Sequence, residues 1–289
     1  MSTMRGPLGG VLFLVASNGL TASVDSVAKH LSRDLHGVQI AWGYAVAIAV
    51  ALLAWSIARP TPLRQALATR RPALQLARPA MLMLTISTLF VGIAHLPLAD
   101  AVAISFTAPL FITVLSIPLL GERVGVHRWL AVVAGLVGVV VIVRPGEAGL
   151  HWAVSMPLVS AVFFALFQIM TRQLAATEKT TTTLLYTGFG GAVWGSMLVP
   201  FFWSPLAPGH LLVFALTGLL GVAAHLCMIK AYEFTQASLL APFNYVKLVW
   251  ASLLGFAAFG EIPGTHVTVG AAIIVASGLY VLQRERRAR

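Results

Sequence analysis

The sequence predicts an all-α membrane protein whose ten transmembrane helices form two inverted five-helix repeats. Of its 289 residues, 58% are hydrophobic and only 10% are charged, and apolar runs fill almost the whole chain. A bilayer core about 30 Å thick needs about 20 apolar residues per helix, and soluble domains carry far more charge. Stretches such as 129–143 are apolar on every side, which favours helices over the alternating polarity of a membrane barrel.

Ten apolar spans are separated by short breaks that contain proline and glycine. The first run follows a single early arginine, as in a signal peptide, but it lacks small-residue cleavage cues and is interpreted as a retained first helix. No linker is long enough to form a soluble domain. In chain order the spans cover residues 8–28, 38–58, 79–96, 99–120, 126–143, 151–171, 182–203, 210–232, 236–259 and 265–283.

The net charge is +10, but the basic residues lie mainly in the breaks between spans and at the C-terminus. This placement favours a role in orienting the helices in the membrane over nucleic-acid binding. With a cytoplasmic N-terminus, only Lys29, Arg33 and Arg144 fall on the opposite side of the membrane. The positive-inside rule therefore predicts that both termini are in the cytoplasm. The chain is expected to be a multi-pass protein of the cell's inner (plasma) membrane. The single cysteine, Cys227, allows no internal disulfide and matches no metal-ligand spacing.

A short motif recurs after the fourth and ninth spans. Residues 121–127 and 260–266 share four of seven positions, beginning with Gly-Glu in both copies. Each copy closes the fourth helix of a five-helix unit, so residues 1–145 and 146–289 are predicted to be repeats. Because five is odd, the second repeat enters the membrane inverted. Transporters often have this architecture, with the substrate site near the midplane where the halves meet.

Several segments together resemble the EamA family of the drug/metabolite transporter superfamily. They are residues 25–29 with 39–42, 96–101 with 108–111 and 120–123, and in the second half 241–245 with 259–261. The resemblance implies transport of a small metabolite without naming the substrate. Many members carry an arginine shortly after the tryptophan of the second helix, whereas Gly43 and Tyr44 follow Trp42 here, so no role is transferred through that arginine.

Lys247 is the main candidate for substrate binding, because a charge deep in a span is costly and asks for an explanation. We expect it near mid-depth, with Asn244 one turn earlier on the same side, so that the two hold an anionic group such as a carboxylate. The alternative is that Lys247 pairs with a structural acid or snorkels to an interface. Four further polar or aromatic residues are candidates for the same site, with packing as their alternative role: Tyr245, Asn18, Trp42 and Gln168.

Coupling or gating is assigned to four other residues. Asp25 and Lys29 are four apart on the first helix and face the same way; they form either a mutual ion pair that anchors the helix end, or a proton acceptor and gate. His225 and His95 are candidates because histidine titrates near neutral pH, although lone histidines in bundles more often serve packing. Glu122 and Glu261 are expected to be structural, capping or tying the short hairpins.

The leading functional hypothesis is a secondary transporter that moves an amino-acid-like or other small organic solute by alternating access, with export favoured. The alternative within transport is a carrier that takes up S-adenosylmethionine, whose charged groups could use both Asp25 and Lys247. An intramembrane enzyme or a structural membrane protein is the alternative of another class, although the motifs of metal hydrolases, serine hydrolases and phosphate-binding loops are absent. No cofactor, metal or nucleic acid is expected; proton coupling and a homodimer are left open.

Overall fold

The computed structural model describes residues 7–57, 63–121, 125–143, 152–175, 177–234 and 240–288, and these residues are almost entirely helical. Seven helical segments are long and apolar enough to cross a membrane, and three shorter apolar helices (Trp129–Val143, Phe243–Phe259 and Thr265–Tyr280) bring the described spans to the expected ten. The chain is therefore a multi-pass helical membrane protein.

The first half of the chain contains α1 (Pro7–Leu31), α2 (Gly37–Ile57), α3 (Leu63–Ala66), α4 (Pro72–His95), α5 (Leu98–Ser105), α6 (Ala108–Leu120) and α7 (Val126–Val143). The second half contains η1 (Trp152–Val154), α8 (Ser155–Ala175), α9 (Thr180–Leu198), η2 (Val199–Phe202), α10 (Pro208–Phe234), η3 (Ala241–Tyr245), α12 (Val246–Phe259) and α13 (Thr265–Ala288).

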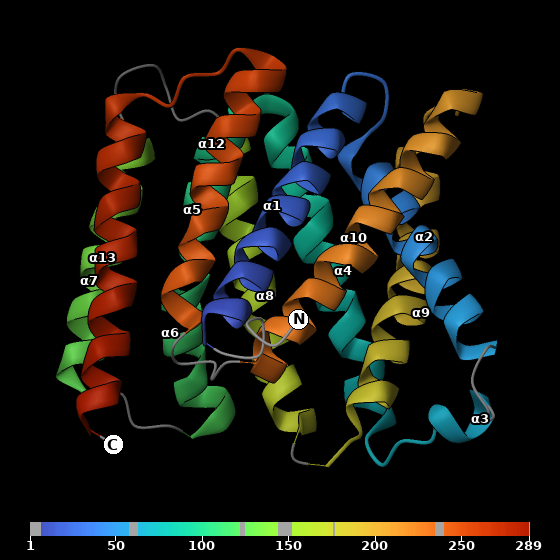
Figure 1. The fold of residues 1–289 in the computed structure, drawn as a ribbon, viewed down its shortest axis with the longest axis horizontal. Coiled ribbons are helices and arrows are strands. Elements are labelled where there is room, and N and C mark those ends of the chain that lie inside the picture. Colours follow the sequence, from blue (N-terminus) through green and yellow to red (C-terminus); the bar gives the residue numbers. More distant parts are fainter. Residues whose placement is uncertain are drawn as a thin grey trace.

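The helices form a central group flanked by two outer pairs (Figure 1). One outer pair is α7 with α13, and the other is α2 with α9. In the central group α1 packs against α10 and α12, while α8 packs against α4 and α6. α1 begins and α13 ends in the lower half of the view, so these two helix ends lie toward the same side of the bundle.

The outer helices expose rows of aliphatic side chains. Val133, Val137 and Val140 on α7 are each at least half exposed, and Leu212 and Leu219 on α10 are more so. Such rows would be unfavourable in water over so large a surface. In a bilayer they face lipid, while each helix satisfies its own backbone hydrogen bonds.

The fourth and ninth spans are not continuous helices, contrary to the sequence expectation. The fourth divides into α5 and α6 at Phe106 and Thr107, just before Pro109. The ninth begins with the 3₁₀ turn η3, which contains Pro242, before α12 starts. A proline has no backbone N–H and clashes with the preceding turn, so it starts a new helical segment more readily than it continues one.

Left-handed glycines end the two interrupted spans in the same way. Gly121 caps α6 with φ of 67°, and Gly260 caps α12 with φ of 69°. Only glycine adopts this conformation without a steric cost, and it leaves the last helical carbonyls hydrogen bonded. Each belongs to one copy of the recurring Gly-Glu motif.

Candidate functional site

A buried ion pair joins α1 to α12. The Nζ of Lys247, the second residue of α12, lies 2.8 Å from Oδ2 of Asp25 on α1. The two side chains are only 20% and 5% exposed. Within the described chain no hydrogen bond of normal geometry reaches Asp25 Oδ2, so charge attraction holds the contact. Each charge offsets the cost of burying the other.

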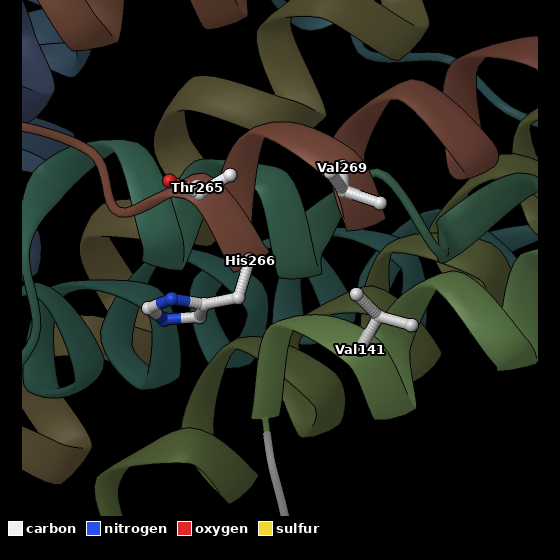
Figure 2. A pocket seen from close by; sticks show the side chains of 4 residues that line it. All are labelled: Val141, Thr265, His266 and Val269. Atoms are coloured by element: carbon white, nitrogen blue, oxygen red, sulfur yellow. The ribbon is translucent and has the colours of Figure 1, made fainter.

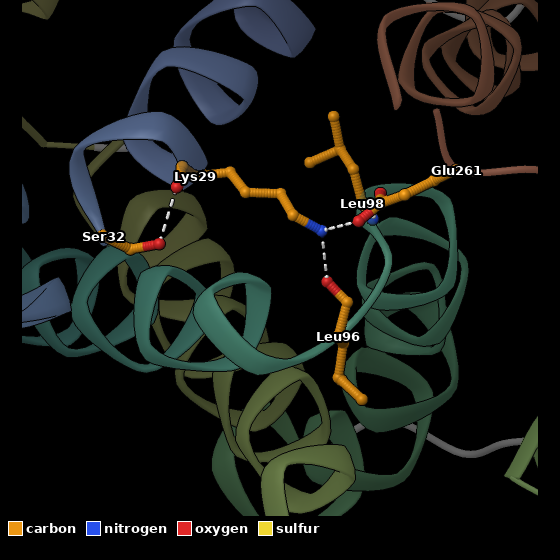
Figure 3. A network of polar contacts seen from close by, with 5 residues as sticks. All are labelled: Lys29, Ser32, Leu96, Leu98 and Glu261. Atoms are coloured by element: carbon orange, nitrogen blue, oxygen red, sulfur yellow. Dashed lines mark hydrogen bonds and ion pairs between the residues drawn. The ribbon is translucent and has the colours of Figure 1, made fainter. Parts of the chain in front are cut away.

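A second ion pair lies one turn further along α1 (Figure 3). Lys29 Nζ donates to Glu261 Oε1, just after α12, and to the carbonyl oxygen of Leu96 at 2.7 Å. Glu261 Oε2 accepts the backbone N–H of Leu98 at 2.9 Å. A carboxylate is favourable here because Leu98 begins α5, where helical N–H groups lack partners. Glu261 thus ties α1, the α4–α5 turn and the α12–α13 connection together.

The two pairs are consecutive on α1 and opposite in polarity. α1 contributes the acid of the first pair, Asp25, and the base of the second, Lys29. The structure therefore pairs Asp25 and Lys29 with Lys247 and Glu261 and not with each other, which was one of the two alternatives. Asp25 and Lys29 each have an opposite charge on α12 or just after it. Their side chains point across the interface between the two helices, so each reaches that charge more directly than it would reach its neighbour on α1.

Asn18 and Tyr245 lie beside the same interface. The Asn18 amide donates to the carbonyl oxygen of Phe243 at 3.0 Å, which binds α1 to the η3 turn. The Tyr245 ring lies 5.2 Å from that of Phe106, at the break between α5 and α6. Asn244 also belongs to η3, so it does not share one α-helix with Lys247 as expected. The two helix breaks therefore meet near the paired charges.

Trp42, Gln168 and His225 are on other helices, α2, α8 and α10. Trp42 donates to Ser196 Oγ at 3.0 Å and packs edge-on against Trp203 and Phe214. Gln168 is exposed on α8, and His225 is exposed on α10 with Nδ1 2.8 Å from the carbonyl oxygen of Gly221.

His95, at the end of α4, lies 4.8 Å from the Trp152 ring. Glu122 lies outside the residues that the structure describes.

Two polar residues with buried groups escaped the sequence analysis. Arg78 was counted as a charge in a break, but α4 begins at Pro72 and not at 79, so Arg78 is inside the helix and 7% exposed. Pro72 at the helix start was the signal that would have found it. Asp100, in the first turn of α5, has a buried Oδ1 without a hydrogen-bond partner among the described residues. It lies within electrostatic reach of Glu261 and Lys29.

A hollow of about 340 Å³ lies on the outer pair α7 and α13 (Figure 2). Val141, Thr265, His266 and Val269 line it. Among the described residues this lining contains no ion pair, and it belongs to helices at the edge of the bundle. We therefore place the candidate site at the α1–α12 interface.

The apolar helices, with ion pairs buried between them, define a polytopic helical membrane protein. The chain belongs to the EamA-like transporter family, whose profile matches residues 8–144 and, a second time, residues 151–283.

Relatives with named functions are transporters and not enzymes. A riboflavin transporter of Rhizobium johnstonii is 32% identical over 77% of this chain and 74% of its own length. An S-adenosylmethionine uptake transporter of Rickettsia prowazekii is 24% identical over 97% of this chain and 94% of its own. A pseudopaline exporter of Pseudomonas aeruginosa is 28% identical over 92% of this chain and 93% of its own length. A protein of known crystal structure, 19% identical in sequence, superposes on this chain with a TM-score of 0.61. The match covers 97% of this chain and 99% of the other, which shows a shared fold.

Proposed function

We propose that this protein is a secondary transporter that moves a small organic solute across the inner membrane by alternating access. Residues 1–145 and 146–289 are the two inverted five-helix repeats of this proposal, with both chain termini in the cytoplasm. The chain's EamA membership and its named relatives support the transport of a small molecule.

Helix packing supports the repeats. If each span of the first half corresponds to the span five places later, α1 matches α8, α4 matches α10, and the α5–α6 span matches α12. Under this correspondence, the contacts of α1 with α10 and α12 predict equivalent contacts of α8 with α4 and α6. The structure contains all four of these helix–helix contacts. The matching caps at Gly121 and Gly260 support the same correspondence.

The observation that carries the proposal is the double ion pair between α1 and α12. It joins the first proposed repeat to the second at Asp25–Lys247 and Lys29–Glu261. With a cytoplasmic N-terminus, α1 ends on the outer side, so these contacts close the outer half of the interface. Alternating access requires that contacts of this kind separate when the halves rock.

We propose that the cargo carries an amino-acid-like group with one positive and one negative charge. Such a group is complementary to Asp25 and Lys247, since each of its charges replaces one partner of the existing pair. The buried pair gives a specific reason to consider S-adenosylmethionine uptake as the second candidate function, because that solute carries an amino-acid group.

The test is solute flux into and out of proteoliposomes that contain the purified protein. Radiolabelled S-adenosylmethionine and riboflavin are the first probes, loaded inside in one arm and added outside in the other to measure direction. We expect saturable flux of at least one probe and its loss in Lys247→Ala at equal insertion. Lys230→Ala is the matched control, because Lys230 pairs with Glu233 at the surface. Equal flux in wild type and Lys247→Ala would exclude this substrate site, and no flux of any tested metabolite would contradict the transport function.

A further inference from the structure

Arg78 is a buried cation whose protein contacts are hydroxyl groups and an aromatic ring. Its Nε donates to Thr171 Oγ1 at 2.6 Å on α8, and its Nη1 donates to Thr187 Oγ1 at 2.5 Å on α9. The guanidinium carbon lies 4.2 Å from the centre of the Phe167 ring. Within the described ranges no carboxylate is ion-paired with it.

This set of contacts leaves the charge of Arg78 only partly compensated. Neutral hydroxyls and a ring face stabilise a guanidinium less than a carboxylate does. A buried cation without a counter-charge is costly in a low-dielectric interior. The Nη2 amino group also makes no hydrogen bond to a described residue, so one edge of the planar fork remains for an acceptor.

The surroundings of Arg78 are unusually polar for a membrane span. Gln75, one turn earlier on α4, is fully buried and donates to Thr183 on α9 at 3.2 Å. Its Oε1 has no partner among the residues that the structure describes. Arg78 follows Pro72 by six residues, so it lies about 9 Å inside the end of the bundle opposite the α1–α12 ion pairs. The exposed Gln168 lies one turn from Thr171 on α8.

We propose that Arg78, Thr171 and Thr187 form an oxyanion site that receives a carboxylate or phosphate group of the transported solute. The inference rests on the proposed transport function and adds a chemical class to its cargo. The guanidinium fork matches the two oxygens of such a group, and the two threonines hold the fork in place. With a cytoplasmic N-terminus, this site lies near the inner end of the solute path, while the ion pairs lie toward the outer end.

The experiment measures the thermal unfolding of the full-length protein in neutral detergent by the fluorescence of its seven tryptophans. Sodium phosphate and sodium acetate are titrated against sodium chloride at equal ionic strength. A separate arm adds phosphatidylglycerol, which distinguishes a free oxyanion from a lipid headgroup. We expect phosphate or acetate to raise the melting temperature of the wild type, because a ligand that binds only the folded state stabilises it.

The Arg78→Gln variant should bind the stabilising anion roughly tenfold or more weakly, since it loses a charge-assisted hydrogen bond. Arg172→Gln is the matched control, because Arg172 is an exposed arginine beside Thr171, and it should respond like the wild type. Arg78→Lys keeps the positive charge but lacks the planar guanidinium, so it should bind the anion more weakly than the wild type. If Arg78→Gln does not fold, the response of Arg78→Lys tests the oxyanion site. Stabilisation by phosphatidylglycerol alone, or equal responses in the wild type and the folded Arg78 variants, would overturn the site. Binding does not require flux, so anion binding at Arg78 without transport would contradict only the transport function.

Discussion

Removing Lys247 should destabilise the protein through the acid it leaves behind. Asp25 is 4% exposed, and its Oδ2 has the Lys247 ammonium as its counter-charge at 2.8 Å. Breaking a buried pair by removing one partner typically costs about 3–5 kcal/mol, whereas neutralising both partners costs much less. We therefore expect Lys247→Gln to lower the free energy of unfolding by about 3 kcal/mol or more, and the double variant with Asp25→Asn to recover most of that loss.

The assay is reversible unfolding of the purified protein in mixed micelles, followed by helix content, for the wild type, both single variants and the double variant. Lys230→Gln is the control: its pair with Glu233 has a 2.6 Å contact but both side chains are about half exposed, so its loss should cost about 1 kcal/mol or less. A double variant as unstable as Lys247→Gln, or a Lys247→Gln loss no larger than that of Lys230→Gln, would refute the reasoning.

Three further predictions concern packing, a helix cap and pH. Gly270→Ala should cost about 1–3 kcal/mol, because an added Cβ would lie 2.5 Å from the carbonyl oxygen of Gly138 on α7; Gly209→Ala, which meets no atom within 4 Å, is its control in thermal unfolding. Gly260→Ala should cost about 1 kcal/mol in the same assay, because alanine is strained at a φ of 69°. Burial lowers the pKa of His36 below its ordinary 6.5, so the unfolded chain binds more protons there than the folded protein. The stability that neutral His36 contributes is thus present above pH 6.5 and is lost as pH falls through the lowered pKa, and His36→Gln should show a smaller acid-side loss of melting temperature.

Hydropathy was sufficient to predict the helices but not their interruptions. The span 126–143 coincides with α7, and the other spans overlap the observed helices within a few residues, except that α4 begins earlier, at Pro72. The length of an apolar span does not show whether the helix is broken near Pro109 or Pro242. Both interrupted spans were therefore predicted to be single helices. The prolines themselves were the available signal.

The residues of the candidate site were easier to select than their partners. Lys247, Asp25 and Lys29 stood out because charges within or beside apolar spans are rare. Glu261 stood out through the recurring Gly-Glu motif and was expected to be structural. The pairing of these four residues depends on how α1 is rotated against α12, and these helices are more than 200 residues apart in the chain. No local spacing encodes that rotation, so the nearest charge in sequence was the wrong partner.

The central claim is that α1 and α12 must separate during transport. In a Cys227→Ser background, cysteines at positions 29 and 261 can be joined by a short, cleavable thiol cross-linker and the flux of the transported probe measured in proteoliposomes. The account predicts that cross-linking arrests flux and that cleavage restores it, while the same reagent leaves the two single-cysteine variants unaffected. Undiminished flux through the cross-linked protein would contradict the claim.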